Sequence, residues 1–213
     1  MKPPGKEAAM QKPIKIIHTA DFHYSRENQE KALQSLETVC NETEKKEVDL
    51  IVIAADLFDR PVNNTEISGF PALIKMIQRM MNITPVVTVT GTPTHDIAGC
   101  YKTFQAIEAR NWFFILEPGK HYFLYLKNEK GPSCVDEWYE EDEAVILIFG
   151  IPEPQKSWFL KDQQLGKAEA DEAIKKGMRD LLLGMGALGK KSPDIPCLLV
   201  YHGAIAGSTL NNS

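Results

Sequence analysis

The sequence lacks several features that would place the protein in other classes. No uncharged apolar run approaches the roughly 20 residues that a membrane span needs, and no apolar core of a signal sequence follows the charged start of the chain. The four cysteines lie far apart without CxxC spacing, so neither a zinc knuckle nor a disulfide framework is indicated. We therefore expect a soluble, cytoplasmic protein with no membrane contact, in which residues 1–13 form a flexible tail.

An excess of basic residues is also missing. The chain has 24 lysines and arginines against 29 aspartates and glutamates, a formal net charge of −5. A protein that binds nucleic acid by itself usually presents a basic face. Here the cations are scattered, and residues 136–143 form a strongly acidic stretch that we expect to be a solvated loop. Any role on DNA would have to rely on bound metal ions or on another subunit.

What the sequence does contain is an alternation of apolar runs and amphipathic segments. The helical spacing of apolar residues predicts helices over 27–47, 66–81, 101–110 and 168–188, with Pro71 in the first turn of the second. The apolar runs predict a first strand ending near residue 17 and further strands over 49–55, 85–90, 112–116, 121–126, 144–149 and 197–201, of which 112–116 and 121–126 would form a hairpin. Alternating strands and helices imply parallel strands with right-handed crossovers, and such sheets carry their sites at the carboxyl ends of the strands.

Metal-binding side chains follow four of the predicted strands at that end. Asp21 and His23 come first, and because residues i and i+2 of an extended segment point the same way, both could reach one ion. The alternative for this pair is that Asp21 caps the next helix and His23 is an ordinary loop histidine. The later strands lead into Asp56, His95 and His202, whereas His121 has no ligand-like neighbour and is interpreted as structural.

Oxygen and nitrogen donors without thiolates suit Mn, Fe or Zn better than a soft metal. A carboxylate that bridges two ions about 3.5–4 Å apart is the usual core of a two-metal phosphoester hydrolase. The two ions activate a water as nucleophile and stabilise the charge that builds on the phosphoryl oxygens. The residue types therefore predict metal-dependent phosphoester hydrolysis.

The ordered motifs resemble those of the calcineurin-like metallophosphoesterase superfamily. They are Asp-x-His, then Asp-x-x-Asp, then Gly…His-Asp, then His-Gly, each after a strand. More narrowly, the motif sequences are similar to those of the DNA double-strand-break-repair exonuclease branch, which includes the nuclease subunit of the SbcCD type. These sequences are His-Thr-Ala-Asp-Phe-His, Ala-Asp-Leu-Phe-Asp and His-Gly-Ala-Ile-Ala-Gly. The similarity runs from about residue 14 to residue 207. It implies an α/β fold in which a two-sheet β-sandwich is flanked by helices, with residues 14–213 as one nuclease domain.

The resemblance also assigns roles to residues. It implies that Asp21 and His23 bind a first metal, that Asp56 bridges both metals, and that His202 binds the second. His95 would contact the scissile phosphate or protonate the leaving oxygen, and Asp59 and Asp96 would orient neighbouring groups. The implied cofactors are two divalent ions, Mn before Fe, Zn or Mg. The implied partners are DNA, a second copy of the chain in a homodimer, and a coiled-coil SMC-like ATPase, acting together in DNA end processing and repair.

Two departures from the family pattern weaken this picture. The third motif usually reads Gly-Asn-His-Asp or Gly-Asn-His-Glu, with the Asn oxygen on the second metal, whereas residues 91–96 have no Asn and are two residues longer. Thr94 is the natural stand-in, and Thr92 or a backbone carbonyl is the alternative. The final Gly-His-x-His motif, one histidine for each metal, does not occur before Ser213. We therefore expect a domain truncated at its C-terminal end, with weak metal binding and little nuclease activity.

Two other functions stay open at this point. A phosphoesterase of the same superfamily that acts on a nucleotide or a phosphoprotein fits the acidic net charge better. A catalytically degenerate interaction domain fits the altered third motif. Metal content, together with activity on DNA and on p-nitrophenyl phosphate esters, separates the three.

Overall fold

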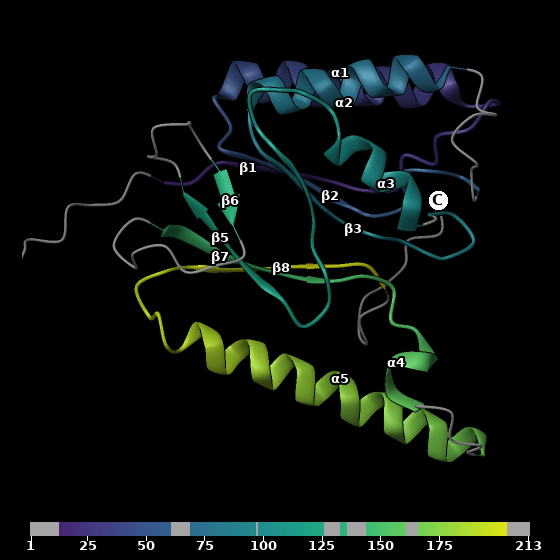
Figure 1. The fold of residues 1–213 in the computed structure, drawn as a ribbon, viewed down its shortest axis with the longest axis vertical. Helices are drawn as coiled ribbons and strands as arrows, with labels where there is room; N and C mark the ends of the chain where they lie inside the picture. Colours follow the sequence, from purple (N-terminus) through teal and green to yellow (C-terminus); the bar gives the residue numbers. More distant parts are fainter. Residues whose placement is uncertain are drawn as a thin grey trace, which may run out of the picture.

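Two four-stranded sheets lie face to face between layers of helices (Figure 1). The computed structural model describes residues 13–60, 69–96, 98–125, 133–135, 144–160 and 166–203. The predicted acidic loop and all but the last residue of the predicted tail lie outside these ranges. The order helix, sheet, sheet, helix confirms the predicted α/β sandwich.

The first sheet is fully parallel. Its order is β1 (Ile16–Thr19), β2 (Leu50–Ala54), β3 (Val86–Val89) and β4 (Phe113–Ile115). Every residue of β2 and β3 is buried, as expected for central strands with both faces covered. The parallel order brings the carboxyl ends of β1, β2 and β3 to one edge.

Three helices cover the outer face of this sheet: α1 (Gln29–Lys46), α2 (Phe70–Ile83) and α3 (Ala98–Gln105). They bury apolar residues such as Leu36 and Ile77 against Ile51 and Ile53 of β2. Pro71 stands in the first turn of α2, where its missing N–H costs no helical hydrogen bond. The prediction of a helix over 101–110 was wrong at both ends, because α3 starts and finishes earlier.

The second sheet is mixed. Its order is β6 (Ser133–Val135), β5 (His121–Tyr125), β7 (Ala144–Ile151) and β8 (Cys197–Tyr201), with only β7 and β8 parallel. Its inner face packs Leu124 and Ile148 against Val52 and Val87 of the first sheet. Its outer face is covered by α5 (Lys167–Gly189), with the short α4 (Lys156–Leu160) beside it. The two layers of strands therefore share one apolar core.

The predicted hairpin of 112–116 with 121–126 was wrong. Strand β4 pairs with β3 in the first sheet, and β5 pairs with β7 and β6 in the second. The turn between them, with Gly119 at φ 78°, carries the chain across the sandwich instead of folding it back. Two apolar strands joined by a short turn have the same sequence pattern whether they pair with each other in a hairpin or belong to two different sheets. The short elements β6 and α4 were not predicted.

Among the described residues, no helix is both long and apolar enough to cross a membrane.

Candidate metal centre

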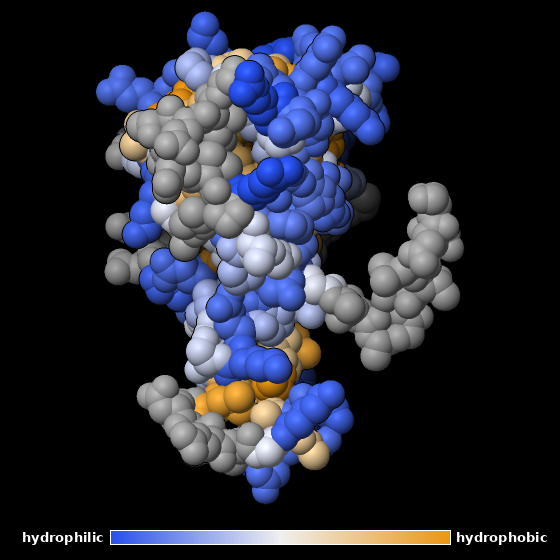
Figure 2. Space-filling view, turned by 90° about the vertical axis from the view of Figure 1, so that its right-hand side faces the viewer, coloured by the Kyte–Doolittle hydropathy of each residue, from blue (hydrophilic) through white to orange (hydrophobic). Residues whose placement is uncertain are grey.

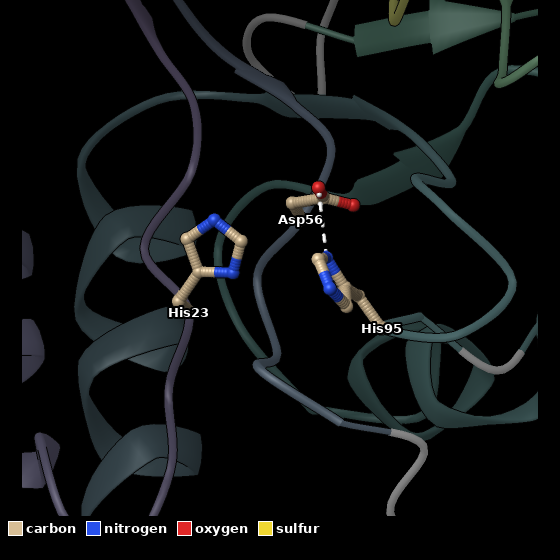
Figure 3. A group of neighbouring side chains, drawn as sticks. All are labelled: His23, Asp56 and His95. Carbon is tan, nitrogen blue, oxygen red and sulfur yellow. Dashed lines mark hydrogen bonds and ion pairs between the residues drawn. The ribbon is translucent and has the colours of Figure 1, made fainter. Parts of the chain in front are cut away.

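The loops that follow β1, β2, β3 and β8 meet at one edge of the sandwich. They bring metal-capable atoms within 4.8 Å of one another in two groups that both contain Asp56: His23, Asp56 and His95 in one, Asp21, Asp56 and His202 in the other. Figure 3 shows the first group, with His23 to the left of the Asp56 carboxylate and His95 below it, joined to it by the dashed line. Residues separated by about 180 positions thus converge as the strand order requires. Figure 2 faces this edge, and its surface is mostly hydrophilic, turning apolar toward the lower part where α4 and α5 lie.

Left-handed backbone, and not extended strand, aims the first ligands. The φ angles of Asp21 and His23 are 55° and 47°, and those of Ala55 and Asp56 are 74° and 46°. The expectation that Asp21 and His23 are aligned by strand alternation was therefore wrong in its mechanism. Cross-loop hydrogen bonds hold this shape: Asp21 N–H donates to the Ala55 carbonyl (3.3 Å), and His23 N–H donates to the Asp56 carbonyl (3.0 Å). Non-glycine residues in strained regions are a common feature of functional sites.

The alternative role for Asp21, as a helix cap, does not match the structure. Helix α1 has Asn28 at its N-cap position, seven residues further along the chain. Asn28 is also tied to Ser25, whose backbone N–H donates to the Asn28 Oδ1 at 2.9 Å. Asp21 instead has an exposed side chain whose Oδ1 lies 4.0 Å from the His23 Nε2. Its position in the loop is explained by the site and not by the helix.

The strain at Ala55 leads to a stability prediction. Ala54, at the end of β2, and Ala55 are both buried, but only Ala55 has a positive φ. Ala54→Gly should cost about 1–2 kcal/mol, through a lost buried methyl group and the backbone entropy of glycine. Ala55→Gly has the same losses, but it also removes the strain of the left-handed conformation, roughly 1–2 kcal/mol. Its free energy of unfolding should therefore stay within about 1 kcal/mol of that of the parent. Urea unfolding of the two variants tests this, and equal destabilisation would contradict the left-handed turn.

Asp56 is the centre of the constellation. The residue is 5% exposed, and both of its carboxylate oxygens have partners. Oδ1 accepts a hydrogen bond from the backbone N–H of Thr92 at 2.9 Å, and Oδ2 lies 3.0 Å from the Nδ1 of His95. The same Oδ2 lies 3.5 Å from the Nε2 of His202. One buried carboxylate therefore connects loops from both sheets.

His23 provides the test of whether a cation fits. Its Nδ1 is buried and has no hydrogen-bond partner among the residues that the structure describes. The Oδ1 of Asp59 is 3.9 Å from this nitrogen, too far for a hydrogen bond. Its ring meets that of His95 edge-on, with centroids 5.0 Å apart. A buried imidazole nitrogen that has a carboxylate nearby but no hydrogen bond is the arrangement expected of a metal ligand. The donor types present here fit a divalent cation.

Comparison with known families decides the assignment. The family described as calcineurin-like phosphoesterase matches residues 14–176, which is more than half of the chain. The chain belongs to the calcineurin-like phosphoesterase family. As a phosphoesterase, it is a hydrolase whose relatives bind divalent metals, and its clustered ligands support metal-dependent cleavage of phosphoesters. His202 lies beyond the matched range, so that its place in this phosphoesterase site rests on the geometry alone.

Asp96 holds two of the ligand loops of the phosphoesterase together. Its Oδ1 accepts the N–H of Phe58, and its Oδ2 accepts the N–H of Gly91 at 2.9 Å and the hydroxyl of Tyr101 at 2.5 Å. Burial raises the pKa of the Asp96 carboxyl, and burial together with the nearby Asp96 raises the pKa of Tyr101 well above its usual value. These contacts tie the loops together, and the orienting role of Asp96 in the reaction stays a prediction. Tyr101 escaped sequence analysis because a buried helix tyrosine looks like core.

The altered third motif takes an unexpected shape. Thr94 is exposed in the turn that carries His95, and the loop contacts Asp56 through the backbone N–H of Thr92. Gly91 is required here, because a Cβ at this position would lie 1.9 Å from the Oδ1 of Asp56. A metal-binding role for Thr94 stays a prediction.

Glu153, which sequence analysis did not single out, lies beside His202. Its Oε2 lies 3.6 Å from the Nε2 of His202. It follows β7, the parallel neighbour of β8, and so reaches the same edge as His202. The rule that found the other ligands, a polar residue just beyond a strand that ends at this edge, would also have found Glu153. The segment had been interpreted only as the end of a strand.

Proposed function

We propose that this chain is a metal-dependent phosphodiesterase that hydrolyses DNA through a two-metal centre, in the processing and repair of DNA ends. The observation that supports this most is the sharing of Asp56 by two ligand groups. A single buried carboxylate between two sets of donors is the arrangement that two-metal phosphoester hydrolases use.

Each ligand has a defined part in this proposal. Asp21 and His23 would hold one divalent ion, His202 the other, and Asp56 both; the pair of ions would supply an activated water and positive charge for the phosphoryl oxygens. Asp59 and Asp96 would fix the orientation of neighbouring groups. Two contacts of Asp59 support this role: its Oδ1 lies 3.9 Å from the Nδ1 of His23, and its Oδ2 lies 3.5 Å from the Nε of Arg60. Manganese is the proposed ion because the resemblance to the repair exonucleases implies it; the oxygen and nitrogen donors, without a thiolate, also suit Fe or Zn.

DNA is the proposed substrate because the wording of three motifs is similar to the repair exonucleases. The net charge of −5 argues that DNA affinity comes from elsewhere, and we include the coiled-coil ATPase and a second copy of the chain as the proposed partners that supply it. The acidic net charge fits a nucleotide or a phosphoprotein substrate better than DNA. We therefore keep hydrolysis of such a substrate as a second candidate function.

The deciding experiment compares substrates with the metal controlled. Metal-free protein is loaded with Mn²⁺, Mg²⁺ or Zn²⁺ and assayed on end-labelled single- and double-stranded DNA, a nucleotide monophosphate, a phosphopeptide and bis(p-nitrophenyl) phosphate. We expect cleavage of DNA and of the nitrophenyl diester with Mn²⁺, and none with chelator. Cleavage of the monoester substrates alone would replace DNA by the second function, and no metal-dependent cleavage of any substrate would refute both.

A further inference from the structure

We infer that Glu153 is a further protein ligand of the cation held by Asp56 and His202. This inference rests on the proposed two-metal function and adds a carboxylate to the half of the site that has the fewest donors. It is argued from the surroundings of one nitrogen atom, Nε2 of His202.

The other nitrogen of His202 defines the tautomer. Nδ1 of His202 lies 3.3 Å from the carbonyl oxygen of Ala54, which can only accept a hydrogen bond. In the metal-binding form of the ring the proton would therefore be on Nδ1, and Nε2 would present a lone pair. Histidines that bind metals commonly donate their second N–H to a carbonyl in this way.

The lone pair on Nε2 faces two carboxylates. The Oδ2 of Asp56 is 3.5 Å away, and the Oε2 of Glu153 is 3.6 Å away. Two carboxylate oxygens thus lie within 3.6 Å of the nitrogen that would bind a cation. The oxygens of Asp56 and Glu153 do not form one group with this nitrogen within 4.8 Å of one another, so the side chain of Glu153 would turn toward Nε2 to share a divalent cation with Asp56. Such a cation would offset the repulsion between the two carboxylates.

Backbone pairing makes the position of Glu153 a fixed one. Ile151, at the end of β7, pairs with Tyr201 of β8, and the N–H of His202 donates to the Ile151 carbonyl at 3.0 Å. Glu153 follows two residues later, and its side chain is 38% exposed. It therefore closes the site from the solvent side while Asp56 closes it from the interior. A set of carboxylates with one imidazole favours Mn²⁺ or Mg²⁺ over softer ions.

The test is a titration of metal-free protein with Mn²⁺, followed by calorimetry and by the loss of the free-ion electron paramagnetic resonance signal. Glu153→Gln keeps the shape of the side chain and removes its charge. Glu42→Gln is the matched control, because Glu42 on α1 is 36% exposed and loses the same charge away from the site. We expect two ions in the parent and the control, and about 10- to 100-fold weaker binding of one of them in Glu153→Gln.

Failure of this inference is distinct from failure of the proposed function. Two ions bound with parent affinity by Glu153→Gln, or both weakened equally, would overturn the role of Glu153 and leave the two-metal function standing. No Mn²⁺ bound by the parent would overturn both. Circular dichroism checks the fold of each variant. If Glu153→Gln does not fold, the carboxyl ¹³C resonance of Glu153 in the unaltered protein decides: it shifts on titration with Mg²⁺ if the carboxylate binds, and an unmoved resonance overturns the inference.

Discussion

Asp56→Asn is expected to abolish metal-dependent hydrolysis while the protein stays folded. Among the residues that the structure describes, the carboxylate of Asp56 is the one group common to both sets of candidate ligands, so its charge would hold two cations side by side. Loss of a group that only supports a ligand typically costs 10- to 100-fold in metal affinity or activity. Loss of the bridging ligand itself should cost at least about 100-fold in both.

The fold should tolerate this substitution for three reasons. An Asn side chain keeps an oxygen for the N–H of Thr92, and its amide can donate to the Nδ1 of His95. Asn also adopts positive φ more readily than most residues, which suits the φ of 46° at position 56. Finally, the negative charge of Asp56 contributes to raising the pKa of the buried Asp96, so its removal relieves a repulsion. We expect the free energy of unfolding of the metal-free variant to match or exceed that of the parent.

The measurement pairs a Mn²⁺ titration with hydrolysis of bis(p-nitrophenyl) phosphate and of DNA. Asp180→Asn, on the exposed part of α5, is the matched control for the change of charge and should behave as the parent. An Asp56→Asn protein that binds two ions and retains activity would refute the bridging assignment. An unfolded variant would refute the argument that Asn fits the site.

The success of sequence analysis at this site comes from topology. Once the first three strands are predicted to be parallel, their carboxyl ends must share an edge, and Asp21, Asp56 and His95 must approach one another. That argument needs no atomic detail. It explains why residues remote in sequence could be grouped correctly, and why the α/β sandwich could be predicted from apolar runs.

What could not be predicted depends on backbone conformation and on pairing across space. The left-handed turns at His23 and Asp56 exist because two loops hydrogen-bond to each other, and neither loop reveals this alone. The crossing of the chain between β4 and β5 depends on which sheet accepts each strand. The proximity of Glu153 to His202 follows only once β7 is known to lie beside β8. Each of these facts is a relation between distant segments.

The role of His95, as a catalytic group or as a metal ligand, can be tested by substitution. It is expected to contact the scissile phosphate or to protonate the leaving oxygen, yet its Nδ1 lies 3.0 Å from the Oδ2 of Asp56, and its ring belongs to one of the two ligand groups. His95→Asn should therefore be compared with His23→Asn, in which a proposed ligand of the first metal is removed. We expect His23→Asn to bind Mn²⁺ at least about 10-fold more weakly, and His95→Asn to bind it nearly as the parent does.

The rate of hydrolysis then separates the two roles left for His95. A positioned general acid contributes typically 10²- to 10⁴-fold, and the loss appears only where the leaving oxygen needs a proton. DNA has a poor alkoxide leaving group, whereas nitrophenolate leaves as a stable anion. If His95 is the acid, His95→Asn should lose about 10²- to 10⁴-fold on DNA and far less on bis(p-nitrophenyl) phosphate. Equal losses on both substrates with intact metal binding would assign His95 to the phosphate oxygens, and weakened Mn²⁺ binding like that of His23→Asn would make it a metal ligand and contradict both roles.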